Sequence, residues 1–358
     1  MTKVPSQYRQ FHYLLIFSLY MIASSITTHL YLEKFGKEIS ISTSQIMDFE
    51  ASRPFAYRIL IPSALRWANE STPDKIKNKI THKSDGSQRE IEALKHYGWQ
   101  NNNSYLFIIC YLFIFISLVF LQVFWRTLLK RTINLNKPSY DLAPALAVIL
   151  LPLTFVKGAY IYDFPELIFA TLCILFLLEK RWFAYYLTFS IACINKETSL
   201  IFGAWFLPLL LQKEFKTFAK HTTAHCILGL PIILSIRYQL NDLPGSSAQF
   251  NFYKNIEFWT SKDPWFRFEY LYAFNLPTPR TFNIINLILI IFPLSKFWKE
   301  LNRDMKHSFI TSTISIAPLY LLFGLEDEIR VFMIAFPSFF VLYTQSLSLL
   351  YSNKLRHT

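Results

Sequence analysis

Long apolar runs, separated by short polar or basic segments, extend along most of the chain. They lie near residues 11–32, 104–125, 140–157, 164–179, 221–238, 282–297, 307–323 and 331–350. A helix that crosses a bilayer needs roughly 20 apolar residues, and most of these runs approach that length. Their apolar residues are continuous rather than alternating with polar ones, which favours helices over strands. The pattern therefore predicts an all-α protein, a polytopic bundle of transmembrane helices.

Two shorter apolar pieces, 182–194 and 198–211, follow one another and are separated by Asn195-Lys196-Glu197. Each has about 13 or 14 residues, or about 20 Å of helix, and is too short to cross a membrane alone. Basic residues lie at both far ends of the pair and favour the cytoplasmic side. We therefore expect a short helical hairpin whose charged tip lies at or just below the outer membrane surface. The bundle or a water-filled cavity must receive that tip, because a charge in lipid is costly.

Apolar residues make up 53% of the chain and charged residues 17%, against about 25% charged residues in a soluble domain. This balance excludes a soluble enzyme and a disordered chain. Together with the hairpin, the runs give about ten spans in a single integral membrane domain, residues 1–358. Two long segments, 33–103 and 239–280, interrupt the spans. The first contains two expected amphipathic helices, at 55–68 and 88–99, and the second is rich in aromatic residues.

The chain carries 36 Lys and Arg against 24 Asp and Glu, which gives a formal net charge of +12. If the N-terminus lies inside, every short basic loop falls on the cytoplasmic side, as the positive-inside rule requires. Both termini are then cytoplasmic, and the two long segments lie outside. Nucleic acid is not an expected partner, because no basic aromatic platform or reading motif accompanies the charge.

Four clusters of polar residues fall at the outer ends of the expected spans. They contain Asp48, Glu50, Arg53 and Arg58 after the first span, Lys157, Tyr160, Tyr162, Asp163 and Glu166 in one turn, Asn195, Lys196, Glu197 and Thr198 at the hairpin tip, and Glu326, Asp327, Glu328 and Arg330 before the last span. Acidic and basic residues occur together in each cluster. Two interpretations remain open: the charges are solvated at the membrane surface, or they line one outward-facing cavity. In such a cavity the carboxylates would supply a base or hold a metal, and Arg and Lys would hold a phosphate.

Lys196 needs an anionic partner, because a lone ammonium group at this depth is costly. Glu197 is adjacent in sequence, but neighbouring side chains on a helix diverge, so we do not expect it to be the partner. One alternative is a structural carboxylate, for which the candidates are Glu326, Asp327 and Glu328. The other is a phosphate that Lys196 shares with Arg330, since two cations that converge on one spot need an anion between them.

The arrangement resembles the GT-C class of membrane glycosyltransferases, which take a sugar from a polyprenyl-phosphate carrier on the non-cytoplasmic side. Three features carry the resemblance: Asp48 before an amphipathic helix in the first outer segment, the hairpin tip at 195–198, and the charged residues 326–330 before the last span. The segment 53–62 also looks like one that recurs in uncharacterised bacterial proteins of this architecture. The acidic pair typical of the class is interrupted here, since Phe49 separates Asp48 from Glu50.

The resemblance implies a mechanism in which Asp48 activates the acceptor hydroxyl and the anomeric carbon is inverted. Lys196, Arg330 and Arg58 would meet the charge of the leaving lipid phosphate. The catalytic candidates are Asp48, Glu50 and Asp163, and the substrate-binding candidates are Arg53, Arg58, Tyr162, Glu166, Lys196, Glu197, Glu326, Glu328 and Arg330. Asp163 and Glu166 would position the acceptor or bind a divalent cation, Mg or Mn, through oxygen ligands.

The partners implied by the resemblance are a lipid-linked sugar donor, membrane lipids, and a glycan, lipid or protein acceptor. The expected location is a bacterial inner membrane, with the active site facing outward. Two other functions remain open. One is a transporter or flippase of a lipid-linked or anionic solute. The sequence argues against this function, because almost no charge lies in the middle of the spans 104–125, 282–297 and 331–350. The other is a polysaccharide polymerase or ligase, or a non-catalytic assembly subunit.

Overall fold

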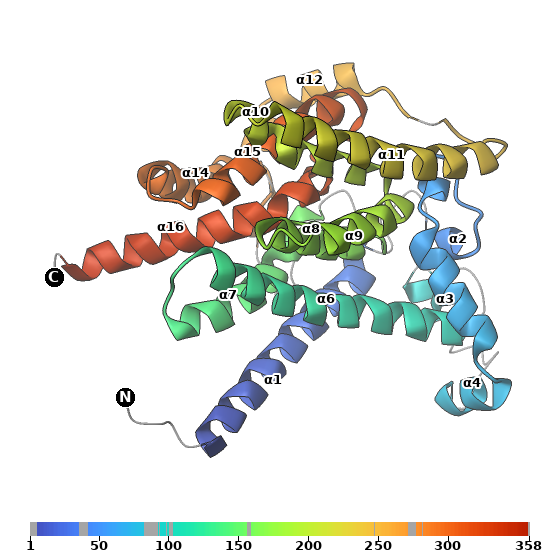
Figure 1. Cartoon of the computed structure of the whole chain (residues 1–358). Coiled ribbons are helices and arrows are strands. Elements are labelled where there is room, and N and C mark those ends of the chain that lie inside the picture. The colour runs from blue at the N-terminus through green and yellow to red at the C-terminus, as the bar shows by residue number, and fades with distance from the viewer. Residues whose placement is uncertain are drawn as a thin grey trace.

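The computed structural model of the chain describes residues 6–35, 42–81, 92, 94–97, 99, 103–155, 159–246, 248–270, 277–280 and 282–356. Helices dominate these residues (Figure 1). Each predicted apolar run is helical, which confirms the all-α prediction. The corresponding helices are α1 (Ser6–Leu30), α6 (Ser104–Thr132), α7 (Lys137–Leu150), α8 (Asp163–Leu178), α11 (Phe215–Gln239), α14 (Ile284–Phe297), α15 (Arg303–Phe323) and α16 (Phe336–Arg356). Short segments of other helix types extend three of them, namely η1 (Tyr31–Phe35), η3 (Leu151–Thr154) and η5 (Ile329–Ala335).

The predicted hairpin is present and turns at Lys196. Its first arm is α9 (Trp182–Asn195), and its second arm is the 3₁₀ helix η4 (Glu197–Phe206) followed by α10 (Leu207–Leu211). Lys196 itself is extended, with φ −161° and ψ 135°, which reverses the chain between the two arms. The side chain of Lys196 is buried, so the charged tip lies inside the bundle.

The two long segments that interrupt the apolar runs, 33–103 and 239–280, contain short elements. The first holds α2 (Thr43–Met47), η2 (Phe55–Tyr57), α3 (Leu60–Ser71) and α4 (Asp74–Ile80). The second holds α12 (Phe252–Thr260), α13 (Asp263–Phe266) and the antiparallel pair of strands β1 (Phe268–Tyr270) and β2 (Pro277–Pro279). The amphipathic helix expected at 55–68 corresponds to η2 and α3, whose Ile61 and Leu65 are buried while Trp67 is exposed. Half of the helix expected at 88–99 lies outside the described residues; among the described half, residues 92 and 94–96 are helical.

Three helical stretches of the described chain are long and apolar enough to cross a membrane: Gln10–Glu33, Ser104–Thr132 and Ile329–Ser352. They make this a membrane protein, with fewer full-length spans than the ten expected from the sequence. The other helices are too short or too polar. For example, α8 has 16 residues and α9 has 14, whereas α11 has 25 residues but contains histidines and charged side chains.

Hydrogen bonds between helices fix the centre of the bundle. The Gln122 amide of α6 donates to Ser24 Oγ of α1 over 2.8 Å, and Trp125 Nε1, one turn further on, donates to Thr171 Oγ1 of α8 over 3.1 Å. Bonds of this kind contribute about 0.6 kcal/mol on average between transmembrane helices. They join α6 both to α1 and to α8, which carries the candidate site.

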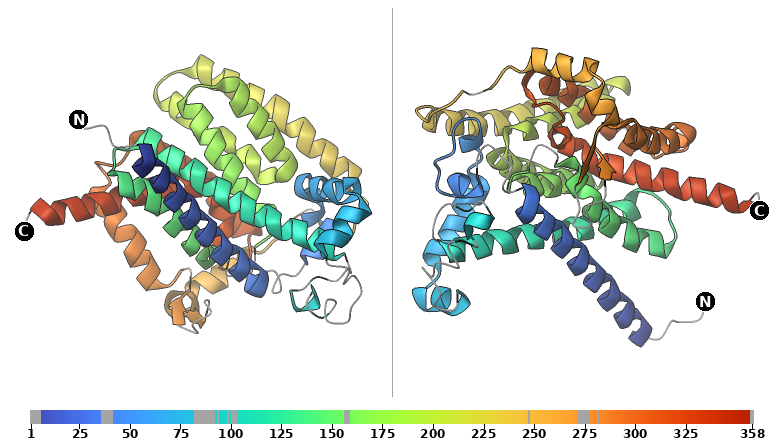
Figure 2. Two further views of the ribbon diagram at one scale, coloured as in Figure 1. Left: turned by 90° about the horizontal axis from the view of Figure 1, so that it is seen from below. Right: turned by 180° about the vertical axis from the view of Figure 1, so that it is seen from behind.

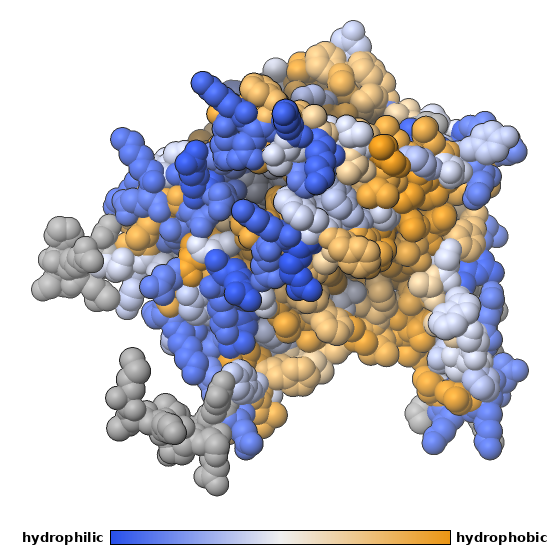
Figure 3. All heavy atoms as spheres, in the orientation of Figure 1, coloured by the Kyte–Doolittle hydropathy of each residue, from blue (hydrophilic) through white to orange (hydrophobic). Residues whose placement is uncertain are grey.

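The distribution of polarity supports a membrane orientation. Both termini lie at one end of the molecule and α2, α3 and α4 at the opposite end, in both views of Figure 2. Hydrophilic residues gather at these two ends, with a hydrophobic surface between them (Figure 3). Large apolar side chains are exposed along the helices, among them Leu14, Phe120, Ile288 and Phe292. An apolar surface this extensive is typical of contact with lipid.

Candidate functional site

The first turn of α8 supplies two buried carboxylates. Asp163 and Glu166 are 0% and 1% exposed, and three residues apart on a helix they share one face. The backbone N–H of Tyr160 donates to Asp163 Oδ2 over 2.9 Å, which closes the turn before the helix. The N-terminal end of α8 also favours negative charge, because its backbone N–H groups point outward.

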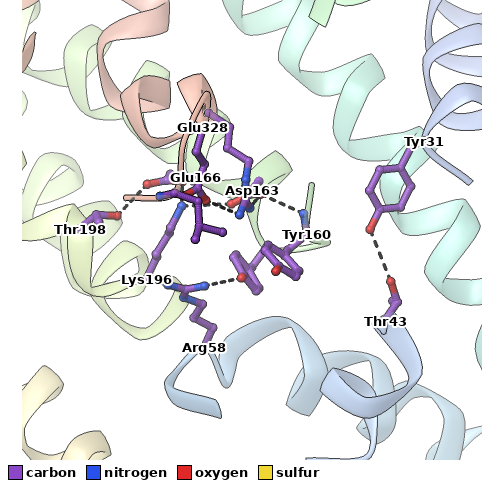
Figure 4. Close-up of polar contacts among 12 residues, drawn as sticks. Tyr31, Thr43, Arg58, Tyr160, Asp163, Glu166, Lys196, Thr198 and Glu328 are labelled. Carbon is purple, nitrogen blue, oxygen red and sulfur yellow. Dashed lines mark hydrogen bonds and ion pairs between the residues drawn. The ribbon is translucent and has the colours of Figure 1, made fainter. Parts of the chain in front are cut away.

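The hairpin places Lys196 against both carboxylates. Its Nζ donates to Asp163 Oδ1 over 3.0 Å and to Glu166 Oε2 over 2.6 Å (Figure 4). Thr198, at the start of η4, donates its hydroxyl to Glu166 Oε1 over 2.8 Å. Asn195 donates its amide to the carbonyl oxygen of Tyr162 over 2.9 Å. The hairpin tip is therefore fastened to α8 and to the turn before it.

Arg330 of η5 approaches the same carboxylate from another side. Its Nη1 donates to Asp163 Oδ2 over 2.7 Å, and its Nη2 pairs with Glu328. The guanidinium group lies over the Tyr160 ring, with its carbon 4.4 Å from the ring centroid. Asp163 thus links two cations, one from the hairpin and one from the start of the last helical region.

Arg58, between η2 and α3, completes the group. Its Nη1 donates to the Tyr162 hydroxyl, and its Nη2 donates to Glu197 Oε1 over 3.2 Å. Its carbon also lies 4.6 Å from the centroid of the Tyr162 ring. The rings of Tyr160 and Tyr162 stack with their centroids 5.2 Å apart, so aromatic faces separate Arg58 from Arg330.

We call this group the Lys196 network. It consists of Arg58, Tyr160, Tyr162, Asp163, Glu166, Lys196, Glu197, Thr198, Glu328 and Arg330. Three cations face four carboxylates, so burial of the charges is largely compensated by pairing. Three buried atoms have no hydrogen-bond partner within the described chain: Arg58 Nε, Glu197 Oε2 and Arg330 Nε. The network therefore retains unused hydrogen-bonding capacity at Arg58 and at Arg330.

An apolar cavity of about 350 Å³ borders the network at Arg58. It is lined by Ile46, Phe49, Ala51, Phe55, Ala56, Arg58, Ile59, Pro62, Ser63, Leu240 and Leu243. Arg58 is the one charged residue among them. Ile46 and Phe49 lie on either side of Met47 and Asp48, and Asp48 is the C-cap of α2, so the cavity wall includes residues close to Asp48 in the chain as well as Arg58. We refer to it below as the apolar cavity.

The structure shows which carboxylates pair with Lys196. Glu197 pairs with Arg58 and not with Lys196, as the divergence of adjacent side chains predicts. The partners of Lys196 are Asp163 and Glu166, so the suggestion of Glu326, Asp327 or Glu328 was wrong for Lys196. Lys196 and Arg330 do converge on one anion, as expected. That anion is the Asp163 carboxylate, so no phosphate is required to hold the two cations together.

Other predicted site residues lie away from these contacts. Arg53 donates through Nη2 to the carbonyl oxygen of Gly245 over 2.6 Å and through Nη1 to Asn241 Oδ1 over 3.1 Å. It therefore joins the segments 33–103 and 239–280, apart from the Lys196 network, and its assignment to substrate binding stays a prediction that the function proposed for the protein does not use. Glu50 is exposed, and Asp48 is half-buried at the end of α2. Glu326 is half-buried in the turn before η5. Lys157 lies outside the described residues.

A divalent cation does not fit at Asp163 and Glu166. The Lys196 ammonium group already lies between the two carboxylates, where an ion would need oxygen ligands free to coordinate it. Among the described residues, no three His, Cys, Asp or Glu side chains are arranged to hold a metal. The chemistry proposed below therefore uses no metal-dependent step.

Arg280 is the residue that the sequence analysis missed. It is 5% exposed and pairs with Asp327, and its Nη1 donates to Glu269 Oε1 over 2.6 Å. Asp327 is in the left-handed region, with φ 59°, and directly precedes Glu328 in the turn that leads to Arg330. No local pattern marks this pair, because its partners are 47 residues apart in the chain.

Replacing Arg280 with methionine should lower the free energy of unfolding by about 3 kcal/mol, since it leaves Asp327 buried without its cation. Arg267 is the matched control, because it pairs with Asp263 and Glu269 but is 46% exposed. Arg267→Met should cost less than about 1 kcal/mol, as for other exposed ion pairs. Denaturant titration of the purified proteins in detergent measures the loss of stability in each variant. Equal losses would show that the Arg280 pair does not secure the turn.

Comparison of the chain with protein-family models, with curated proteins and with solved structures gave no match.

Proposed function

We propose that the protein is a membrane glycosyltransferase of GT-C type, which transfers a sugar from a polyprenyl-phosphate donor to an acceptor on the non-cytoplasmic side. The observation that carries the proposal is the apolar cavity with Arg58 at its wall and the Lys196 network behind it. An isoprenoid phosphate combines an apolar chain with an anionic group. The cavity offers apolar surface for the chain, and guanidinium forks match phosphate oxygens.

In this proposal Arg58 has the first role in the reaction. The donor phosphate binds the Arg58 guanidinium, whose direction is fixed by Tyr162 and Glu197. Lys196 and Arg330 lie behind it, and the carboxylates of Asp163, Glu166 and Glu328 already neutralise their charges. Their part in the proposal is to hold the hairpin tip and the turn before η5 in place, so that the Arg58 guanidinium is oriented before the donor arrives.

Asp48 is assigned the role of base. The acceptor oxygen bonds to the anomeric carbon as the bond from that carbon to the phosphate oxygen breaks, and the leaving electron pair stays on the phosphate. The acceptor proton passes to Asp48, and the anomeric configuration is inverted. Asp163 is not assigned this role, because both of its oxygens accept hydrogen bonds from Lys196, Arg330 and the backbone.

Binding of the donor lipid tests the proposal. Native mass spectrometry would compare polyprenyl phosphate with the uncharged polyprenol of the same length. Arg58→Gln should weaken binding of the phosphate by about tenfold, on the scale of one charge-assisted hydrogen bond, and leave polyprenol binding unchanged. Arg53→Gln is the control variant, and it should bind polyprenyl phosphate and polyprenol as the wild type does. Equal binding of the two lipids, or an unchanged Arg58→Gln variant, would contradict a phosphate site at Arg58.

The proposal includes the orientation expected from the basic loops: about ten crossings that count the short hairpin, both termini in the cytoplasm, and the cavity outside. In a variant that lacks its four cysteines, Cys110, Cys173, Cys193 and Cys226, a cysteine at Ser352 should react only after membranes are opened. A cysteine at Lys75, on α4, should react with a membrane-impermeant reagent on intact cells. Labelling of the Ser352 position from outside would reverse the orientation and remove the basis for an outward-facing site.

A transporter of a lipid-linked or anionic solute is the second candidate. The observation that favours it is the burial of Lys196, Asp163 and Glu166 within the bundle, since ionisable groups in membrane helices often belong to ion or substrate pathways. Movement of intact donor lipid across proteoliposomes, without transfer of its sugar, would favour this function over the transferase.

A further inference from the structure

A second cavity, of about 300 Å³, lies between α3, α4 and the start of α6, at the end of the molecule opposite the termini (Figure 1). Its lining is polar, unlike that of the apolar cavity. Three amide side chains contribute, those of Asn69, Asn78 and Asn103, together with the hydroxyl-bearing residues Ser104 and Tyr105. Asp74 and Lys77 complete the lining. We call this cavity the polar pocket.

The charges of the polar pocket cancel. Lys77 Nζ lies 3.6 Å from Asp74 Oδ1, in an ion pair along one helical turn. The pair therefore presents a polar but formally neutral edge. An anionic ligand such as a phosphate would find no unpaired cation among these lining residues, and an apolar chain would find little apolar surface. The ligand that fits is polar and neutral.

Neighbouring contacts hold two of these polar groups, those of Tyr105 and Asn103. The Thr72 hydroxyl donates to the carbonyl oxygen of Ala68 over 2.7 Å, so the Tyr105 hydroxyl, 3.2 Å away, donates to Thr72 and keeps its own acceptor positions. Asn103 Oδ1 caps α6 by accepting from the backbone N–H of Leu106 over 2.9 Å. Asn69 Oδ1 is buried and has no hydrogen-bond partner within the described chain. A buried amide oxygen without a partner is costly, and a turn of the Asn69 side chain into the pocket would let a ligand hydroxyl satisfy it.

We infer that the polar pocket binds a neutral saccharide. Sugar hydroxyls both donate and accept, which matches amides, a carboxylate and a tyrosine hydroxyl in one place, and the pocket volume is suited to one or two sugar rings. The inference rests on the polar pocket alone and not on the proposed transferase. If the saccharide site and the proposed transferase activity both exist, the pocket is a site for a glycan acceptor on the outer side.

An oligosaccharide array tests the inference, with the purified full-length protein in lipid nanodiscs as the probe. The protein should bind neutral oligosaccharides and show no preference for acidic ones. For the strongest ligand on the array, Asn69→Ala and Asn78→Ala should each weaken binding about five- to tenfold, which corresponds to one hydrogen bond. Lys75→Ala is the control, because Lys75 is exposed on α4 outside the pocket lining, and it should bind as the wild type does.

Two results would overturn the inference. One is the absence of saccharide binding above that of empty nanodiscs. The other is binding that Asn78→Ala leaves unchanged; Asn78 is exposed, so this variant stays informative even if Asn69→Ala fails to fold. Neither result depends on the donor lipid, because Arg58 and the apolar cavity are tested separately with polyprenyl phosphate. Failure of the saccharide site and failure of the transferase are therefore distinguishable.

Discussion

Replacing Lys196 with methionine should destabilise the bundle by about 3–5 kcal/mol, the cost of breaking a buried ion pair by removing one partner. The reason is the position of its Nζ, which lies 3.0 Å from Asp163 Oδ1 and 2.6 Å from Glu166 Oε2. Without the ammonium group, two buried carboxylates face each other. Denaturant titration in detergent, followed by circular dichroism, measures the loss.

Two further variants make this prediction specific. Lys216→Met, at an exposed position in the first turn of α11, should change stability by no more than about 0.5 kcal/mol. Adding Glu166→Gln to Lys196→Met should recover part of the loss, because it removes the carboxylate charge that has lost its cation, while Asp163 keeps Arg330. A Lys196→Met protein as stable as the wild type would mean that the pairing contributes nothing to the fold.

Asp48→Asn should reduce sugar transfer by about 10²–10⁴-fold, the usual contribution of a general base. Stability should change little, because the substitution keeps the shape of a half-buried side chain at the end of a short helix. Turnover is measured with a radiolabelled lipid-linked sugar, and folding with the same titration as above. Glu50→Gln, at an exposed position two residues away, is the matched control and should keep wild-type turnover.

The assignment of the base has a clear rival. Asp163 is the other predicted catalytic carboxylate, and it lies inside the Lys196 network. If Asp48→Asn keeps wild-type turnover while Asp163→Asn remains folded and loses transfer, then Asp163 is the base and Asp48 is not. That outcome would require Asp163 to release one of its cations during the reaction.

The helices were predictable because a continuous apolar run is visible in the local sequence and does not depend on how the helices pack. Each run from 11–32 to 331–350 is helical in the structure, and the reversal at Lys196 follows from two runs too short to cross a membrane. The number of full-length spans was less predictable. Histidines and charged residues inside α11, and the division of the chain near 151–163 by η3 and a turn, reduce the length of uninterrupted apolar helix.

The charged residues of the site were predictable from the sequence, but the ion pairs that they form were not. Sequence alone placed Lys196, Asp163 and Arg330 at one end of the bundle, because topology brings these turns to the same side. It did not show that Asp163 would lie between Lys196 and Arg330, since that depends on how α8, the hairpin and η5 pack. The contacts of Arg53 were unpredictable for the same reason, because its bond to Gly245 joins residues that are 192 apart in the chain.

The most direct test of the central claim is transfer of radiolabelled sugar by the purified protein. Polyprenyl-phosphate hexoses and pentoses would be offered together with glycan, lipid and protein acceptors from extracted membranes. The account predicts that label from one of these donors moves to an acceptor, that free polyprenyl phosphate is released in equal amount, and that Asp48→Asn abolishes both. Intact donor lipids from the whole panel, moved across proteoliposomes with no sugar released, would contradict it.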